Sequence, residues 1–267
     1  MRLYQLDAFT DRLFAGNPAA VCPLTEWLPD ETMQQIAAEN NLAETAFYTY
    51  NPDTNRYHIR WFTPLVEVDL CGHATLATAY VIFNLEPFVG DSNRILLDSR
   101  SGELTVCRED DGWLVLDFPA DTYQKAIVLP PALVASFALK PLEIYKGKTD
   151  YMLVYATQEE IEKLDPDFRE LATIPARGVI ACAPGNDGDV DFVSRFFAPQ
   201  CGIDEDPVTG SAHTTLIPYW AGKLGKTEMT ARQLSKRGGY LRCKLKPDGR
   251  VDIAGQVSLY LTGEIFV

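Results

Sequence analysis

Two of the three histidines in the sequence stand where an apolar segment begins, shortly after a glycine. His73 follows Gly72 and precedes the apolar run 76–83, and His213 follows Gly210. Such a run is typical of a buried helix, whose first turn offers unpaired N–H groups and the positive end of the helix dipole. A helix start of this kind binds anions and disfavours the imidazolium cation. We therefore expect these histidines to be neutral and able to relay a proton, His73 above all.

Glu44 is an acidic residue in the otherwise apolar, strand-like segment 41–48. The corresponding place in the second half of the chain, near residues 178–180, carries no carboxylate. A single half-buried glutamate in one half is what a catalytic acid/base would look like, because burial favours a carboxyl group that both takes and returns a proton. The alternative is a glutamate that caps a neighbour or faces water at the edge of the strand.

Three acidic residues precede a second glycine-containing helix start, in the segment 204–211. Asp206 could orient a protonated partner there. Ser211 could bind a carboxylate with its hydroxyl and its backbone N–H. The alternative is that these side chains only cap the helix.

Cys71 stands two residues before His73, which raises the possibility of a nucleophilic thiol or a metal pair. Cys-x-His without a further ligand nearby does not indicate zinc, so we expect no metal. A thiol at a helix N-terminus would have a lowered pKa and could act as an acid or base. Ser211 lacks the Gly-x-Ser-x-Gly context of a hydrolase, and no nucleotide-binding motif is present. We expect no cofactor.

The motifs around these residues occur twice. Arg60–Pro64 is matched by Arg195–Pro199, Gly72–Thr75 by Gly210–His213, and Gly102 by Gly239. The three pairs share a spacing of roughly 137 residues, which indicates a duplicated unit.

The duplication predicts two similar domains, 1–118 and 119–257, with a strand at 258–267 that could return to the first domain. Each repeat predicts a curved sheet with one apolar helix inside it, at residues 73–84 and 211–222. A further helix should begin with Asp30 as its N-cap, and a turn is expected at residues 184–188.

The composition of the chain argues against some classes of binding partner. The chain has 267 residues, 46% of them hydrophobic, and a net charge of −13. This charge argues against nucleic acid and, less strongly, against anionic membranes. The six cysteines lie scattered, and neither a secretory signal nor a membrane-spanning run is evident. Reduced thiols in a cytoplasmic protein are expected.

These motifs together resemble the PhzF-like (phenazine biosynthesis-like) family and, more distantly, the diaminopimelate epimerase superfamily. The resemblance covers essentially the whole chain. The segments that carry it are 7–10 with 16–18, 42–45, 60–64, 72–75 and 206–213. It implies an α+β fold of two pseudo-symmetric domains, each a sheet or barrel around a central helix, with the active site in the cleft between them and a homodimer as the usual assembly.

The family's chemistry is a cofactor-free proton shift, in which a glutamate takes a proton from one carbon and returns it to another. The resemblance therefore implies Glu44 as the acid/base, with His73 and Asp206 around the reacting centre. A small carboxylate-bearing substrate would be held at the two helix starts. The residues implied in its binding are Cys71, Gly72, Ala74, Gly210 and Ser211.

Two alternatives remain open. Superfamily epimerases use two cysteines, one at each helix start. Here Cys71 stands at the first, but Asp206–Thr209 fills the second, and Cys201 lies upstream. A racemase would have to pair Cys71 with a carboxyl group. The other alternative is a metabolite-binding or interaction protein that kept the fold and lost the reaction.

Overall fold

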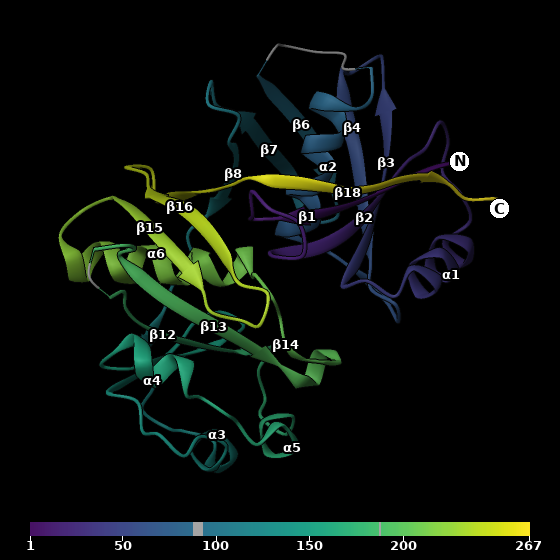
Figure 1. Cartoon of the computed structure of the whole chain (residues 1–267). Coiled ribbons are helices and arrows are strands. Elements are labelled where there is room, and N and C mark those ends of the chain that lie inside the picture. The colour runs from purple at the N-terminus through teal and green to yellow at the C-terminus, as the bar shows by residue number, and fades with distance from the viewer. Residues whose placement is uncertain (88–92, 187) are drawn as a thin grey trace. The chain divides into compact units, whose positions relative to one another are not determined.

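The computed structural model describes residues 1–87, 93–186 and 188–267. The chain divides into two compact units (Figure 1). The first unit comprises Met1–Phe118 and Asp252–Val267, and the second comprises Pro119–Val251. Residues 252–257 therefore belong to the first unit, not to the second as the sequence predicted. The predicted turn at residues 184–188 includes residue 187, which lies outside the described residues.

The first unit is built on a mixed sheet in the order β18-β1-β2-β3-β4-β6-β7-β8, with the short β5 beside β4. The C-terminal strand β18 pairs antiparallel with β1, which ties the end of the chain to its beginning. Its strands are β1 (Arg2–Ala8), β2 (Asn17–Pro23), β3 (Glu44–Asn51), β4 (Arg56–Phe62), β5 (Glu67–Val68), β6 (Arg94–Ser99), β7 (Gly102–Arg108), β8 (Leu114–Pro119) and β18 (Val257–Glu264).

The second unit repeats this pattern with the order β9-β10-β11-β12-β13-β15-β16 and β14 beside β13. The parallel pair β11–β12 is equivalent to β2–β3 of the first unit, and the parallel pair β13–β15 is equivalent to β4–β6. Its strands are β9 (Gln124–Lys125), β10 (Glu143–Lys146), β11 (Tyr151–Val154), β12 (Val179–Pro184), β13 (Phe192–Ala198), β14 (Ile203–Glu205), β15 (Glu228–Gln233) and β16 (Gly239–Leu245), while β17 (Arg250–Gly255) spans the boundary of the units.

Each unit contains one long apolar helix. The helix α2 (Gly72–Asn84) lies against β1, β2 and β3, and α6 (Gly210–Leu224) lies against β15 and β16. Most side chains of both helices are buried, because apolar residues occupy nearly their whole circumference. Both helices begin within one residue of the predicted positions. No helix of the described residues is both long and apolar enough to cross a membrane.

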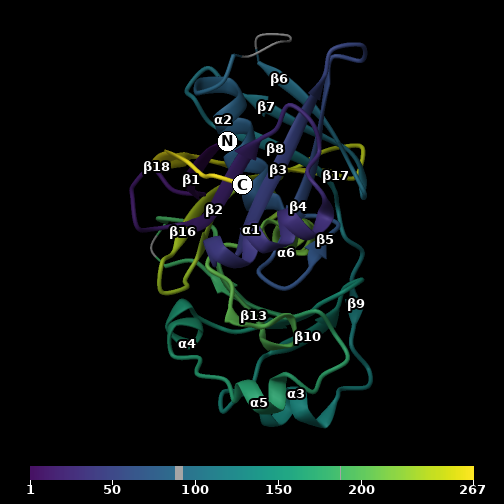
Figure 2. The ribbon, with the colours of Figure 1, turned by 90° about the vertical axis from the view of Figure 1, so that its right-hand side faces the viewer.

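The shorter helices are α1 (Asp30–Asn40), α3 (Pro131–Ala135), α4 (Gln158–Glu162), α5 (Phe168–Leu171) and the 3-10 turn η1 (Pro199–Cys201). Some of them connect parallel strands: α1 lies between β2 and β3, and α4 and α5 lie between β11 and β12. Figure 2 shows α1 beside β3 and β4, and α3 close to α5. Asp30 is the first residue of α1 and its N-cap is Pro29, so the predicted capping role of Asp30 is wrong.

One arginine–glutamate clamp recurs in both units and shows that the duplication extends to side chains. On β4, Arg60 binds Glu67 with Nε–Oε1 at 2.8 Å, and on β13, Arg195 binds Glu205 with Nε–Oε1 at 2.7 Å. Each guanidinium also lies over a phenylalanine ring of its own strand. Each clamp joins the strand before the central helix to the short strand that leads into that helix. The start of each helix is therefore held in place by its own unit.

A glycine turn holds the beginning of β2. Gly16 has a positive φ of 64°, and a Cβ atom there would lie 2.2 Å from the carbonyl oxygen of Ala8. Only glycine fits such a close approach in this backbone conformation. The turn places Asn17, the first residue of β2, in the buried interior.

Candidate active site

Glu44 lies at the beginning of β3, directly after the chain has left α1. Asn41 ends that helix in the left-handed conformation, with φ at 48°, and the chain then turns into β3 beside Ala19 of β2. The side chain of Glu44 is 19% exposed, so it is largely buried but remains open to a ligand. This half-buried strand position agrees with the one expected from the sequence.

His73 is the second residue of α2 and is buried. Its Nε2 atom lies 3.1 Å from Oε2 of Glu44, and its Nδ1 atom lies 3.1 Å from the amide nitrogen of Asn17 and 3.5 Å from Sγ of Cys71. An amide nitrogen can only donate, so in the neutral form of the ring Nδ1 accepts and the proton lies on Nε2, next to Glu44. The Glu44 carboxylate and the His73 ring lie within ion-pair distance of each other.

The charge of His73 differs from the expectation. Burial lowers the pKa of this ring, but Cys71 and the Glu44 carboxylate raise it, and together they bring the pKa well above its ordinary value. We attribute the rise to Glu44, since a protonated thiol carries no charge. The helix dipole expected to keep His73 neutral is therefore outweighed by the neighbouring carboxylate.

Cys71 is the N-cap residue of α2 and is 6% exposed. Burial, and after it the Glu44 carboxylate, raise the pKa of its thiol to about 11. The lowered pKa expected for a thiol at a helix N-terminus is therefore wrong here. The equivalent N-cap of α6 is Thr209, so the second unit has no thiol at the matching position.

Glu44, Cys71 and His73 also have the spacing of a metal-ligand cluster, since one ligand atom from each lies within 4.8 Å of the others. The sequence suggested only Cys71 and His73, because Glu44 comes from a different element. Carboxylate, thiolate and imidazole are all zinc ligands.

The backbone at the start of α2 completes this site. Helix geometry leaves the N–H groups of Gly72, His73 and Ala74 without intrahelical partners. The structure thus brings together in the first unit the predicted residues Glu44, Cys71, Gly72, His73 and Ala74.

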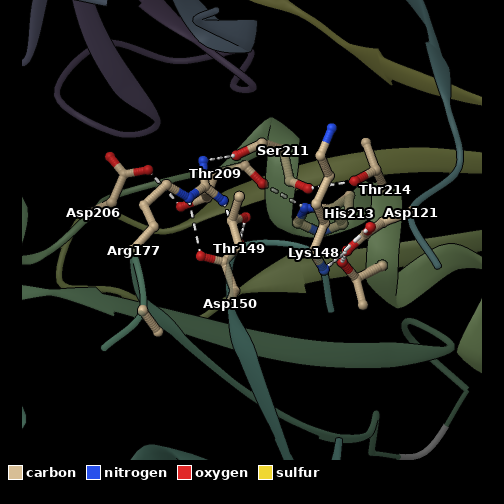
Figure 3. A network of polar contacts seen from close by, with 12 residues as sticks. Asp121, Lys148, Thr149, Asp150, Arg177, Asp206, Thr209, Ser211, His213 and Thr214 are labelled. Carbon is tan, nitrogen blue, oxygen red and sulfur yellow. Dashed lines mark hydrogen bonds and ion pairs between the residues drawn. The ribbon is translucent and has the colours of Figure 1, made fainter. Parts of the chain in front are cut away.

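Gly210 and Ser211 are the first two residues of α6 in the second unit. Figure 3 shows Ser211 and Asp206 in one network of polar contacts. Asp206 is 8% exposed and accepts a short hydrogen bond from the hydroxyl of Thr209. The side-chain amide of Gln233 donates to the carbonyl oxygen of Asp206 at 2.8 Å and to the Thr209 hydroxyl. Asp206 is therefore held as a fixed, buried carboxyl group.

His213 has a different environment from His73. It is fully buried, and its Nδ1 lies 2.8 Å from the carbonyl oxygen of Thr209, so Nδ1 carries the proton and donates. Burial lowers its pKa to about 4, and the contact with Thr209 only partly opposes this. His213 is neutral, as expected, and it supports the first turn of α6.

Three residues of these clusters were not singled out in the sequence. Asn17 contacts His73, while Arg177 in the second unit binds both Asp150 and Ser211. The segment Gly16–Pro18 was noted only as a turn. Arg177 stands just before the strand that is equivalent to the one carrying Glu44. This equivalent position is the sequence feature that could have identified it.

The whole sequence also matches a known family. The sequence pattern of the family described as phenazine biosynthesis-like protein covers residues 6–263. The chain belongs to this family. The recognition made from its motifs is thereby confirmed.

Relatives of this family cover the chain from end to end. A Pseudomonas aeruginosa protein named as an uncharacterized isomerase is 50% identical over 266 residues, which is 99% of this chain and 98% of that protein. The crystal structure of a PhzF family protein from Enterococcus faecalis has 44% identity and a TM-score of 0.92, covering 100% of this chain and 99% of that one.

A more distant structure shows the shared fold alone. A probable proline racemase from Agrobacterium radiobacter has 9% identity and a TM-score of 0.66, covering 100% of this chain and 93% of that one. Together with the family structures, it confirms the predicted α+β fold of the diaminopimelate epimerase type.

Proposed function

We propose that this protein is a cofactor-independent isomerase that moves a proton between two carbons of a small carboxylate-bearing metabolite. The observation that carries the proposal is the partly open Glu44 carboxylate 3.1 Å from Nε2 of the buried His73. The isomerase name of the Pseudomonas aeruginosa relative supports the same reaction class.

In the proposed reaction, a carboxylate oxygen of Glu44 removes a proton from a substrate carbon. The electron pair of that C–H bond moves into the adjacent π system of the substrate, and the π electrons shift along it. Glu44, now neutral, returns the proton to the carbon at the other end. Nothing is oxidised or reduced overall, and the enzyme ends in its starting state.

His73 would assist by hydrogen bonding. Its Nε2 proton lies beside the carboxylate that must gain and lose charge during the reaction. A hydrogen-bond donor in that position stabilises the ionised form of Glu44, both before the proton is taken and after it is returned. Asn17 fixes the ring by its contact with Nδ1.

The test is solvent deuterium incorporation into a panel of small carboxylic acids, followed by NMR, with wild type and Glu44→Gln compared. We expect incorporation by the wild type and a loss of about a hundredfold or more in Glu44→Gln. Glu39→Gln, an exposed acid of α1, is the matched control and should behave as wild type.

The outcomes separate the alternatives. Full exchange by Glu44→Gln would end the proposed role of Glu44. Exchange that depends on Cys71 instead would favour a racemase or epimerase. Binding of a panel member without exchange at any carbon would favour a binding protein on the same fold.

A further inference from the structure

The first unit contains a cavity of about 670 Å³ that the reaction proposed above does not use. It lies at the end of α2, where Ile82 and Glu86 contribute to its wall. Glu44 and His73 lie at the opposite end of the same helix. Because a helix of 13 residues is about 20 Å long, the cavity is separate from the Glu44 site. A volume of this size is typical of pockets that hold small organic molecules.

Three tyrosine side chains form one wall of the cavity. Tyr48 and Tyr50 lie on the same face of β3, and Tyr57 stands opposite Tyr50 on β4. The centroid of the Tyr57 ring lies 5.8 Å from that of Tyr48 and 5.0 Å from that of Tyr50. The three rings therefore form one continuous aromatic surface. Leu24 and Leu28, from the segment after β2, add apolar surface to the cavity.

The carboxylate of Glu86 lines the same cavity and uses only one of its two oxygens. The hydroxyl of Tyr4 donates to Oε1 of Glu86 at 2.5 Å, and Nη1 of Arg2 donates to the same oxygen at 3.1 Å. The Oε2 atom meets no hydrogen-bond donor among residues 1–87, 93–186 and 188–267. The carboxylate is thus held in place by one oxygen and can accept a hydrogen bond from a ligand with the other.

Tyr48 adds a second polar group whose hydrogen bonds are not satisfied. The residue is 5% exposed, and its hydroxyl has no hydrogen-bond partner in the part of the chain that the structure describes. Burial, and after it the neighbouring Glu86 carboxylate, raise the pKa of Tyr48, so its hydroxyl is neutral. Buried polar groups are normally hydrogen-bonded. An unpaired hydroxyl near an open carboxylate oxygen therefore indicates a ligand that carries hydrogen-bond donors.

The charges around the cavity favour a cation. Its lining side chains include the carboxylates of Glu26 and Glu86 and the guanidinium of Arg2, which together leave one negative charge. The Glu86 side chain is 19% exposed and that of Arg2 is 58% exposed, so the negative group is the more enclosed of the pair. The chain ends at Met1 and Val267 also line the cavity, with one charge of each sign. The faces of tyrosine rings also attract cations.

We propose that this cavity binds a primary amine with an aromatic body. The ammonium group donates to Oε2 of Glu86 and to the hydroxyl oxygen of Tyr48, and the aromatic body packs against the tyrosine wall. A carboxylate ligand would meet Glu86 as a like charge, and a neutral alcohol would lack the ion pair. This binding site is independent of the proposed isomerisation, which depends on Glu44.

The probe for this site is para-fluorophenethylamine, with para-fluorophenylethanol as its neutral counterpart of the same shape. The 19F shift and line width of each compound are followed by NMR during titration with the untagged, full-length protein near neutral pH. We expect saturable binding of the amine by the wild type, and binding of the alcohol that is about tenfold or more weaker.

Two variants test the site without changing its shape. Glu86→Gln removes the charge and keeps an oxygen that can accept from Tyr4, and we expect it to bind the amine about tenfold or more weakly. Tyr48→Phe keeps the ring and removes the hydroxyl, and we expect a loss of about threefold to tenfold. The matched controls lie outside the cavity and should bind as the wild type does: Glu39→Gln in α1 and Tyr80→Phe in α2.

Each contrary result overturns the amine site. The first is no saturable binding of the amine by the wild type, and the second is equal affinity for the amine and the alcohol. The third is equal amine affinity in the wild type and Glu86→Gln. Glu44→Gln should bind the amine normally, and a loss there with full binding by Glu86→Gln would place the amine at Glu44 instead.

Failure of this inference is distinguishable from failure of the proposed reaction. Glu86→Gln should catalyse deuterium exchange as the wild type does, because Glu86 lies at the far end of α2 from Glu44. Loss of exchange in Glu44→Gln with unchanged amine binding would support both proposals separately.

Discussion

His73 and Ser211 occupy the same position in two copies of one helix, each being the second residue of the central helix of its unit. His73 lies beside the carboxylate of Glu44, whereas Ser211 lies beside the guanidinium of Arg177. Glu44 is the first residue of β3, and Arg177 lies two residues before the equivalent strand β12. The central helices are equivalent in the two units, but the charged group beside the helix start is a carboxylate in the first unit and a guanidinium in the second.

The identity of the base follows from the state of the thiol. Since Cys71 is buried with a pKa of about 11, it is a protonated thiol at neutral pH and a poor base. We expect Cys71→Ser to keep most of the deuterium exchange, while Glu44→Gln loses about a hundredfold or more. Timed alkylation with iodoacetamide provides a check, because the exposed Cys201 should react long before Cys71. Rapid alkylation of Cys71 would contradict its assignment as an inert thiol.

The ion pair of His73 should make stability depend on pH. Burial lowers the pKa of His73, but the opposing effects of Cys71 and Glu44 are larger together, so the pKa lies well above 6.5. A raised pKa stabilises the folded state fully below the unfolded value of about 6.5, and the contribution is lost as pH rises through the folded pKa. The difference in unfolding free energy between wild type and His73→Gln, from urea titrations, should therefore be largest in mild acid and shrink in alkaline buffer. If the difference in unfolding free energy grew with pH instead, the raised pKa of His73 would be contradicted.

The sequence was sufficient to predict the two central helices and most strands around them, because each leaves a local pattern of apolar residues. The repeated Arg60 and Arg195 motifs also located the duplication, and the structure shows that each arginine holds the same clamp. The return of the chain to the first unit was placed too late, at 258 instead of 252. Nothing in a strand pattern says which sheet the strand joins.

The chemistry was predicted less completely, because it depends on residues brought together from separate elements. Glu44 and His73 were both predicted, but the shift in the pKa of His73 arises from their contact, which the sequence does not show. Arg177 was missed because a lone arginine before a strand is common. Its contacts are with Asp150 and Ser211, which lie far from it in the sequence.

The cluster of Glu44, Cys71 and His73 leads to a prediction about metal ions. The proposed reaction uses no metal, so exchange should persist after exhaustive treatment with a chelator. Added Zn2+ should inhibit, because the three ligand atoms lie within 4.8 Å of one another and include those used in proton transfer. Inhibition should strengthen as pH rises, since zinc binds the thiolate. Cys71→Ser should be less sensitive, and an unchanged sensitivity would place the inhibitory zinc elsewhere.

Two glycines should respond to alanine in opposite ways. Gly16→Ala puts a Cβ atom 2.2 Å from the Ala8 carbonyl oxygen in a positive-φ backbone, so we expect a loss of at least about 1 kcal/mol in unfolding free energy. It should also disturb Asn17 and, through it, His73. Gly222→Ala, in α6 with open space around it, should stabilise by about 0.5–1 kcal/mol. Chemical denaturation measures both variants, and a neutral Gly16→Ala would refute the proposed close approach.

His213 should make the protein sensitive to acid. Burial lowers its pKa from 6.5 to about 4 in the folded state, so between these values the unfolded chain binds more protons than the folded one. Stability should therefore fall as pH drops through this window, by about 3 kcal/mol in full from this residue. In His213→Gln this part of the acid sensitivity should disappear, which denaturant titrations at neutral pH and near pH 4.5 would show as a shallower slope. An equally steep slope in His213→Gln would assign the acid sensitivity to other groups.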